Sequence, residues 1–186
     1  MLSAQQKNTL STMTEQTDIM MARSISLSED ITKELNQCLT ANGKTFSDLN
    51  DNPQLIMDLE SALYPSLKSA LDVKYCSGVF VVLDATVNTK TEYADTSRMG
   101  IYLRLSDLKA VNTSKQHVVF FRGNADIARA EQVQLHNRWN LEFDTSALPG
   151  YEQIMQFDGN RLVESCLWTD RLELSDTWED VQLLYV

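Results

Sequence analysis

Apolar positions in the first part of the chain recur at helical spacing. Residues 1–50 have a loose 3.6-residue period in a polar background rich in Thr and Gln, which indicates helix. Ser26 and Glu29 have the spacing of a capping box, so we expect a helix start there. An apolar stripe follows at Ile31, Leu35, Cys38 and Leu39. Gly43 is the expected C-cap, because glycine readily adopts the left-handed conformation that ends many helices.

A second helix is expected from residue 53. Asn52 is a favourable N-cap, and Pro53 suits the first helical position because its missing N–H is not needed there. Pro65 is expected to kink this helix. Its apolar face comprises Leu55, Ile56, Leu59, Leu63, Leu67 and Leu71.

The hydrophobic period then changes to one typical of strands. Dense runs rich in β-branched and aromatic residues at 77–84, 99–105 and 118–121 predict three strands, and 161–168 and 179–186 predict two more. Residues 88–98 are polar and predict a loop. Between the third and fourth strands, Ile127, Ala130, Val133 and Leu135 fit a short helix, and 151–157 fits another after the Pro149-Gly150 turn.

This order predicts an α+β fold. A long N-terminal helix and a second helix precede a mostly antiparallel sheet with helical insertions, and strands and helices do not alternate as in a Rossmann sheet. We expect an N-terminal helical region over 1–50 and one structural unit over 51–186.

Composition narrows the classes of partner. The chain has 186 residues, 43% of them apolar, and a net charge of −10, which disfavours nucleic acid and anionic membrane surfaces. It has no run of eighteen apolar residues and no apolar stretch of a signal peptide near its start, so we expect a soluble chain. The three cysteines lack metal-ligand spacing, and we interpret them as small buried hydrophobes.

A catalytic set is not evident. Cys76 has no local signature with His117 or His136, and Asp84, Glu142 and Asp144 have positions typical of side chains that cap turns. We therefore expect no enzyme activity in this chain, no cofactor and no metal site.

Several aromatic and charged residues lie at the ends or on the faces of predicted strands. A sheet covered on one side by helices forms concave sites of this kind, with a few polar groups on an apolar wall. The alternative for each residue is a surface ion pair or a half-buried cation. The candidates for binding a small molecule are Tyr102, Arg104, Arg122, Trp139, Trp168 and Asp170.

The succession of segments resembles a known family. The two helices followed by residues 76–88, and then 97–104, 121–123, 135–139 and 178–186, are similar to the PAS-like domains called Cache. More narrowly, they resemble the extracytoplasmic sensor regions of Firmicutes sensor histidine kinases and related membrane-anchored regulators. The resemblance covers roughly residues 5–186. It implies a PAS-like sheet that binds a small molecule at the outer face of the bacterial cell membrane.

The resemblance also implies a mechanism. The first helix would continue from a transmembrane helix, pair with the same helix of a second copy, and transmit a ligand-induced shift to a kinase or transcription module. Membrane contact would occur only through flanking segments. The Arg, Trp-Tyr and Asp motif of amino-acid-binding members is not matched, since 167–170 has only part of it, so no ligand is transferred. Because the sequence ends at Val186 before a Gly-containing final strand, the resemblance implies a cut domain, a divergent sheet or an edge completed by a partner chain.

Two other hypotheses stay open. One is a soluble interaction or small-molecule-binding module that is not attached to a receptor, in which the N-terminal helix binds a partner. The other is an enzyme that uses Cys76 or the carboxylates Asp84, Glu142 and Asp144.

Overall fold

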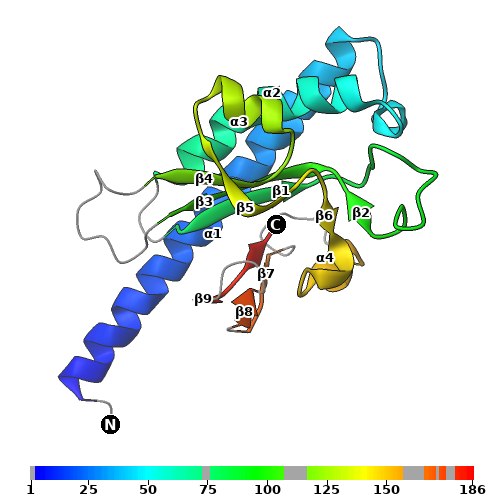
Figure 1. Cartoon of the computed structure of the whole chain (residues 1–186). Helices are drawn as coiled ribbons and strands as arrows, with labels where there is room; N and C mark the ends of the chain where they lie inside the picture. Colours follow the sequence, from blue (N-terminus) through cyan, green and yellow to red (C-terminus); the bar gives the residue numbers. More distant parts are fainter. Residues whose placement is uncertain (1–2, 73–75, 107–116, 157–165, 171, 175–178) are drawn as a thin grey trace. The chain divides into compact units, whose positions relative to one another are not determined.

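The computed structural model describes residues 3–72, 76–106, 117–156, 166–170, 172–174 and 179–186. The fold is mixed α+β, as predicted, with a long N-terminal helix and a mostly antiparallel four-stranded sheet (Figure 1). The chain divides into two compact units. The first comprises Met1–Glu29 and Glu152–Val186, and the second comprises Asp30–Tyr151. Because of this division, each unit is described by itself.

Helix α1 spans Ala4–Ala41 without interruption. The expected start at Ser26 is therefore wrong. A capping box does begin the helix, but at Ser3 and Gln6, where the Gln6 N–H donates to Ser3 Oγ at 3.2 Å and the Ser3 N–H donates to Gln6 Oε1 at 2.8 Å. The sequence signal at Ser26 is overridden because the helical period continues on both sides of it.

The C-terminal end of α1 confirms the prediction for Gly43. Its φ is +61°, and the Gly43 N–H donates to Thr40 O while the Lys44 N–H donates to Leu39 O. These two bonds form a Schellman motif, which satisfies carbonyls that the helix itself leaves open. A short 3₁₀ helix, η1 (Phe46–Leu49), follows.

Helix α2 spans Pro53–Ala70 and begins as predicted. Asn52 caps it, because its side-chain oxygen accepts a hydrogen bond from the Leu55 N–H at 3.2 Å. Pro65 lies inside the helix on an exposed position. The apolar stripe predicted for this helix is buried, with Leu59, Leu63 and Leu67 fully inaccessible.

The central sheet of the second unit has the strand order β1-β3-β4-β5. Strands β1 (Gly78–Val82), β3 (Gly100–Leu105) and β4 (Val118–Arg122) pair antiparallel, whereas β5 (Gln134–Asn140) pairs parallel with β4. Two short strands, β2 (Ser97–Arg98) and β6 (Phe143–Asp144), form a separate antiparallel pair. The three strands predicted from the first apolar runs are confirmed.

The segment after β4 corrects one prediction. Helix α3 spans only Ala125–Ala130, and Gln132 has a φ of +56°, which ends the helical path. Val133 and Leu135 therefore do not continue the helix, and Leu135 lies in β5. Apolar residues at near-helical spacing lie on both sides of a turn, so the pattern predicted one helix where the structure has a helix, a turn and a strand. Further along, η3 (Thr145–Ala147) and α4 (Tyr151–Met155) follow, and the helical prediction for 151–157 is confirmed as far as Met155.

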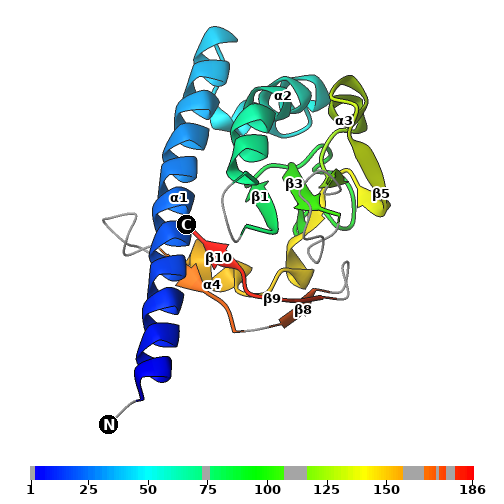
Figure 2. The ribbon, with the colours of Figure 1, turned by 90° about the vertical axis from the view of Figure 1, so that its left-hand side faces the viewer.

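One face of the central sheet packs against helices. Helices α2 and α3 lie on the same side of the sheet in both views (Figures 1 and 2). The side chains facing them include Leu103 and Phe120, which are paired across β3 and β4 and are 0% exposed. Tyr64 of α2 stacks over Phe120 at a ring-centroid distance of 6.4 Å. This layer of α2 against the sheet is the core of the second unit.

In its described residues, the first unit contains the N-terminal part of α1, most of α4 and four short strands. Strand β7 (Leu167–Trp168) pairs antiparallel with β10 (Leu184–Tyr185), and β8 (Leu172–Leu174) pairs with β9 (Glu179–Val181). The predicted final strand over 179–186 is thus two strands in two different sheets. Most of the predicted strand at 161–168 lies outside the described residues. No helix in the described part of the chain has an apolar stretch of the length that a membrane span requires.

Candidate functional site

The second face of the central sheet carries rings and arginines. Side chains alternate along a strand, so Tyr102 and Arg104 point away from the face on which Leu103 meets α2. Phe80 lies opposite Tyr102 on β1, with their rings edge to face at 6.2 Å. Phe121 lies on the other side of Tyr102, with ring centroids 5.0 Å apart. We call Phe80, Tyr102, Phe121, Arg104 and Arg122 the aromatic face.

A β-bulge brings the β4 members of this face together. Tyr102 pairs with Arg122 and Leu103 pairs with Phe120, so Phe121 is the extra residue between them. Bulges re-aim side chains in this way, and they place two residues of one strand opposite one of the other. Phe121 and Arg122 therefore both lie beside Tyr102.

Gly78 packs closely against the aromatic face. A Cβ at this position would lie 3.3 Å from Tyr102 Cε2 and 3.5 Å from Arg104 Cγ. Tyr102 and Arg104 thus border the glycine from the neighbouring strand. Arg104 is 4% exposed, and a guanidinium that is removed from water is retained only with polar or charged partners.

Three of the six predicted site residues, Tyr102, Arg104 and Arg122, therefore lie side by side. Trp139, on β5, donates its Nε1–H to Gly123 O at 3.0 Å. Arg122 donates from its Nη1–H groups to Phe121 O of its own strand at 2.8 Å and to Arg138 O of β5 at 3.0 Å.

Trp168 and Asp170 belong to the other unit. Trp168 is half-buried on β7, and within the described part of the chain its Nε1 is buried without a hydrogen-bond partner. Asp170 is exposed.

His136 is not among the binding residues predicted from the sequence, but it lies beside them in the structure. Its ring stacks on Phe121 with centroids 4.0 Å apart, which makes it the neighbour of the aromatic face on β5. Its Nδ1 accepts a hydrogen bond from the Arg138 N–H at 3.2 Å. The sequence pattern does not predict this placement, because it indicates no strand over 134–140 and therefore no facing direction for the His136 side chain.

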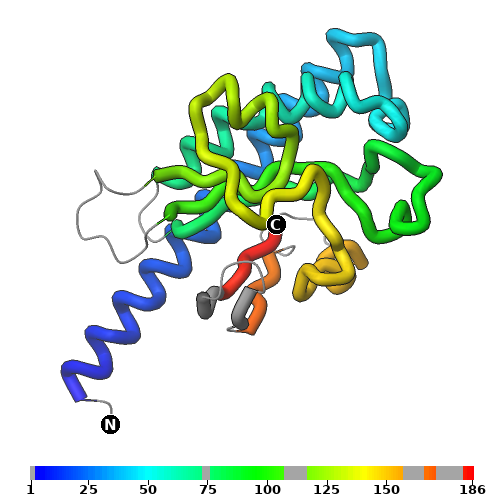
Figure 3. Tube along the Cα trace, in the orientation of Figure 1, coloured from blue at the N-terminus to red at the C-terminus, as the bar shows by residue number. Residues whose placement is uncertain are grey.

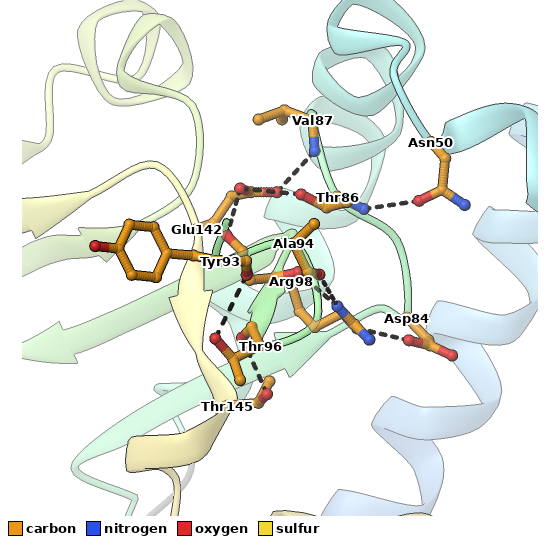
Figure 4. A network of polar contacts seen from close by, with 11 residues as sticks. Asn50, Asp84, Thr86, Val87, Tyr93, Ala94, Thr96, Arg98, Glu142 and Thr145 are labelled. Carbon is orange, nitrogen blue, oxygen red and sulfur yellow. Dashed lines mark hydrogen bonds and ion pairs between the residues drawn. The ribbon is translucent and has the colours of Figure 1, made fainter. Parts of the chain in front are cut away.

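A polar network holds the long connection from β1 to β2, which Figure 3 traces in green. Its centre is the Glu142 carboxylate, which accepts hydrogen bonds from the Val87 N–H at 2.8 Å and from Ser97 Oγ at 2.6 Å (Figure 4). Thr86 adds a longer bond to the same carboxylate, at 3.3 Å, and its own N–H donates to Asn50 Oδ1 at 3.0 Å. The network thus joins this connection to the turn before α2 and to the chain after β5.

Arg98 completes the network at the end of β2. Its Nε–H donates to Asp84 Oδ1 at 2.6 Å, and its Nη1–H groups donate to the carbonyls of Ala94 and Ser97 (Figure 4). Asp84 is more than half exposed, so the ion pair itself contributes little stability. The connection from β1 to β2 is held mainly by the several short hydrogen bonds of this network, and not by the ion pair.

The three carboxylates named in the enzyme hypothesis all make structural hydrogen bonds. Asp84 and Glu142 accept hydrogen bonds within the polar network of the β1–β2 connection, and Asp144 caps η3 by accepting hydrogen bonds from the N–H and Oγ of Ser146. Turn capping, the role expected for strand-end aspartates, is thus confirmed for Asp144. Burial raises the pKa of the Cys76 thiol, which opposes formation of a nucleophilic thiolate. Among the described residues, no group of three His, Cys, Asp or Glu side chains is arranged to hold a metal ion.

Comparison with protein-family models, with curated proteins and with solved structures finds no match to this chain.

Proposed function

We propose that this chain is the extracytoplasmic ligand-sensing domain of a bacterial membrane receptor, of the kind found in sensor histidine kinases. The observation that carries the proposal is the aromatic face. It gathers three rings and two arginines on the side of the sheet opposite α2. Rings supply apolar area and arginines supply a charged orienting group, which is the usual composition of a small-molecule site.

The ligand expected at this face is a small molecule with an anionic group. Tyr102 and Phe121 are 5.0 Å apart, close enough to act as one apolar surface for a planar or aliphatic part. Arg104 and Arg122 favour a carboxylate, because guanidinium groups match its geometry.

Signal transfer is assigned to α1. The helix belongs to both units, with its C-terminal part in the unit that holds the aromatic face. In the proposed receptor it pairs with α1 of a second copy. A ligand shifts such a pair only by binding one of its two arrangements more tightly than the other.

Ligand binding is tested on the full chain with free amino acids, aliphatic dicarboxylates and aromatic carboxylates such as benzoate. We expect at least one of them to raise the melting temperature and to shift amide signals of β1, β3 and β4. Tyr102→Leu should weaken binding at least tenfold. Tyr93→Leu is the matched control, because Tyr93 lies exposed on the β1–β2 connection. No binding across the panel by the folded chain, or equal weakening by both variants, contradicts the proposed site.

The receptor assignment has its own test, the sequence of the parent gene for about 60 codons on each side. A membrane span needs about 20 apolar residues. Spanning segments flanking the chain support an extracytoplasmic sensor, and a start codon at Met1 with a stop codon after Val186 contradicts it.

A protein-interaction module is the second candidate function. The observation that favours it is the surface of α1, where Leu10 and Met13 are 52% and 60% exposed. In this alternative the helix binds a different protein and no membrane receptor is involved.

A further inference from the structure

Glu60 is a carboxylic acid in the core of the second unit. It lies on the inner face of α2, one turn after Ile56 and one turn before Leu63, and is 1% exposed. Both of those neighbours are buried apolar residues. A carboxyl group at such a position is uncommon, because removing its charge from water is costly.

The Glu60 side chain joins three elements. Its Oε1 accepts a hydrogen bond from the Gly100 N–H at 3.2 Å, and its Oε2 accepts one from the Asn124 N–H at 2.9 Å. Gly100 is the first residue of β3, and Asn124 is the N-cap of α3. The two sites are adjacent, since a Cβ on Gly123 would lie 3.1 Å from Gly100 O.

We propose that Glu60 is a pH-operated latch, whose neutral carboxyl holds α2 against the junction of β3 and α3 and whose ionisation favours release of that junction. The proposal rests on the placement of Glu60 and not on the proposed ligand. It describes a conformational device within the second unit.

The acid–base behaviour of Glu60 supports the latch. Burial raises the pKa of Glu60 to about 8, although the hydrogen bonds from Asn124 and Gly100 lower it, and the charge of Glu142 raises it further. The carboxyl is therefore largely neutral at pH 7. Above pH 8 the buried form must carry a charge, so states in which the carboxylate reaches water become more favourable.

The charged groups on the other elements that pack against α2 do not neutralise the charge that Glu60 acquires when it ionises. Strand β1 has no ionisable side chain, Asp48 of η1 accepts hydrogen bonds from Thr45, and Arg104 of β3 points to the aromatic face. On α3, Asp126 and Arg129 pair with each other on the surface.

On α2 itself, Lys68 faces solvent and pairs with Glu131. The Tyr64 hydroxyl, one turn after Glu60, stays neutral over this pH range because burial raises its pKa.

The sign of the pH effect follows from linkage. Between about pH 4.5 and pH 8 the folded state retains the Glu60 proton and the unfolded state does not, so stability falls as pH rises. The equilibrium constant for unfolding should increase by up to about tenfold per pH unit in this window, and the effect should level off above pH 8.

The first experiment is urea unfolding of the full chain from pH 5 to pH 9, with Glu60→Gln as the variant. Glutamine stays neutral, so the pH-dependent loss of stability should disappear. Because its amide nitrogen cannot accept a hydrogen bond, the variant should be less stable than the original chain at pH 5 and should approach it at pH 9. Asp58→Asn is the control, since Asp58 is on the exposed side of the same helix. A steep dependence that persists in Glu60→Gln overturns the proposal.

A second experiment uses the chain with Glu60 unchanged, so it tests the latch even if the Glu60→Gln variant does not fold. The ¹³C signal of the Glu60 carboxyl should titrate near pH 8, and the amide signals of Gly100 and Asn124 should follow the same curve. Glu142→Gln should lower the titration midpoint, because it removes a negative charge that acts on Glu60. A midpoint near the ordinary value of 4.5, or amide signals that ignore the titration, overturns the latch.

Discussion

At the scale of single residues, glycine is required where the backbone leaves no room for a side chain. Gly100 has a φ of +149°, and a Cβ there would lie 2.0 Å from the carbonyl oxygen of Val81. Val81 is on the neighbouring strand, so the obstacle is backbone and cannot rotate away. The same residue donates its N–H to Glu60. The close approach of β1 and β3 and the hydrogen bond to the Glu60 carboxyl therefore both require that residue 100 has no Cβ.

Gly100→Ala is therefore expected to destabilise the fold by about 3 kcal/mol or more, because strain and a backbone clash act together. The control is Gly43→Ala, where a Cβ meets nothing within 4 Å and only the left-handed φ of +61° is unfavourable. That change should cost about 1 kcal/mol. Urea midpoints of the two variants measure the difference. Similar midpoints would show that β1 and β3 separate easily near Gly100.

At the scale of elements, local signals predicted those boundaries that depend on near neighbours. Asn52 and Pro53 marked the start of α2, and Gly43 marked the end of α1, because capping is satisfied within a few residues. The capping pair Ser26 and Glu29 predicted a helix start that the structure does not have, because the helical period continues through it. Strand β5 was missed because its pairing with β4 is parallel and nonlocal.

The candidate site was predictable in part. Strand alternation indicated that Tyr102 and Arg104 share a face, but the bulge that adds Phe121 and Arg122 depends on register across strands. Glu60 did interrupt the apolar face of α2 in the sequence. The pattern alone gave no partner for it, because Gly100 and Asn124 are 40 and 64 residues away.

Helix α1 gives a prediction at this scale about self-association. Leu10, Met13, Thr17 and Met20 follow the alternating three- and four-residue spacing of a coiled-coil seam. This seam carries no charge, so two copies of an acidic chain meet there without repulsion. The expected state is a dimer. Each buried Leu or Met contributes about 2 kcal/mol, so Leu10→Gln with Met13→Gln should weaken dimerisation at least tenfold.

Analytical ultracentrifugation measures this dimerisation. The control is Asn8→Gln with Glu15→Gln, two positions on the opposite side of the helix, which should leave the dissociation constant unchanged. A chain that stays monomeric at high micromolar concentration contradicts pairing through α1.

At the scale of the whole molecule, the two units differ in their cores. The fully inaccessible side chains among the described residues, such as Leu59, Met99, Ile101 and Phe120, belong to the second unit. Among the residues of the first unit whose side chains are described, Tyr185 is the one buried apolar residue. Apolar burial supplies most of the stability of a fold, so the second unit should resist denaturant longer than the first.

Tryptophan fluorescence separates the two units during urea unfolding. Trp139→Phe leaves Trp168 and Trp178, both from the 152–186 segment of the first unit, and Trp168→Phe with Trp178→Phe leaves only Trp139 of the second unit. The variant that retains Trp139 should show the higher urea midpoint. Circular dichroism of the unaltered chain should then contain both transitions. Coincident midpoints for both probes would instead mean one cooperative fold, because two-state unfolding gives the same transition by every probe.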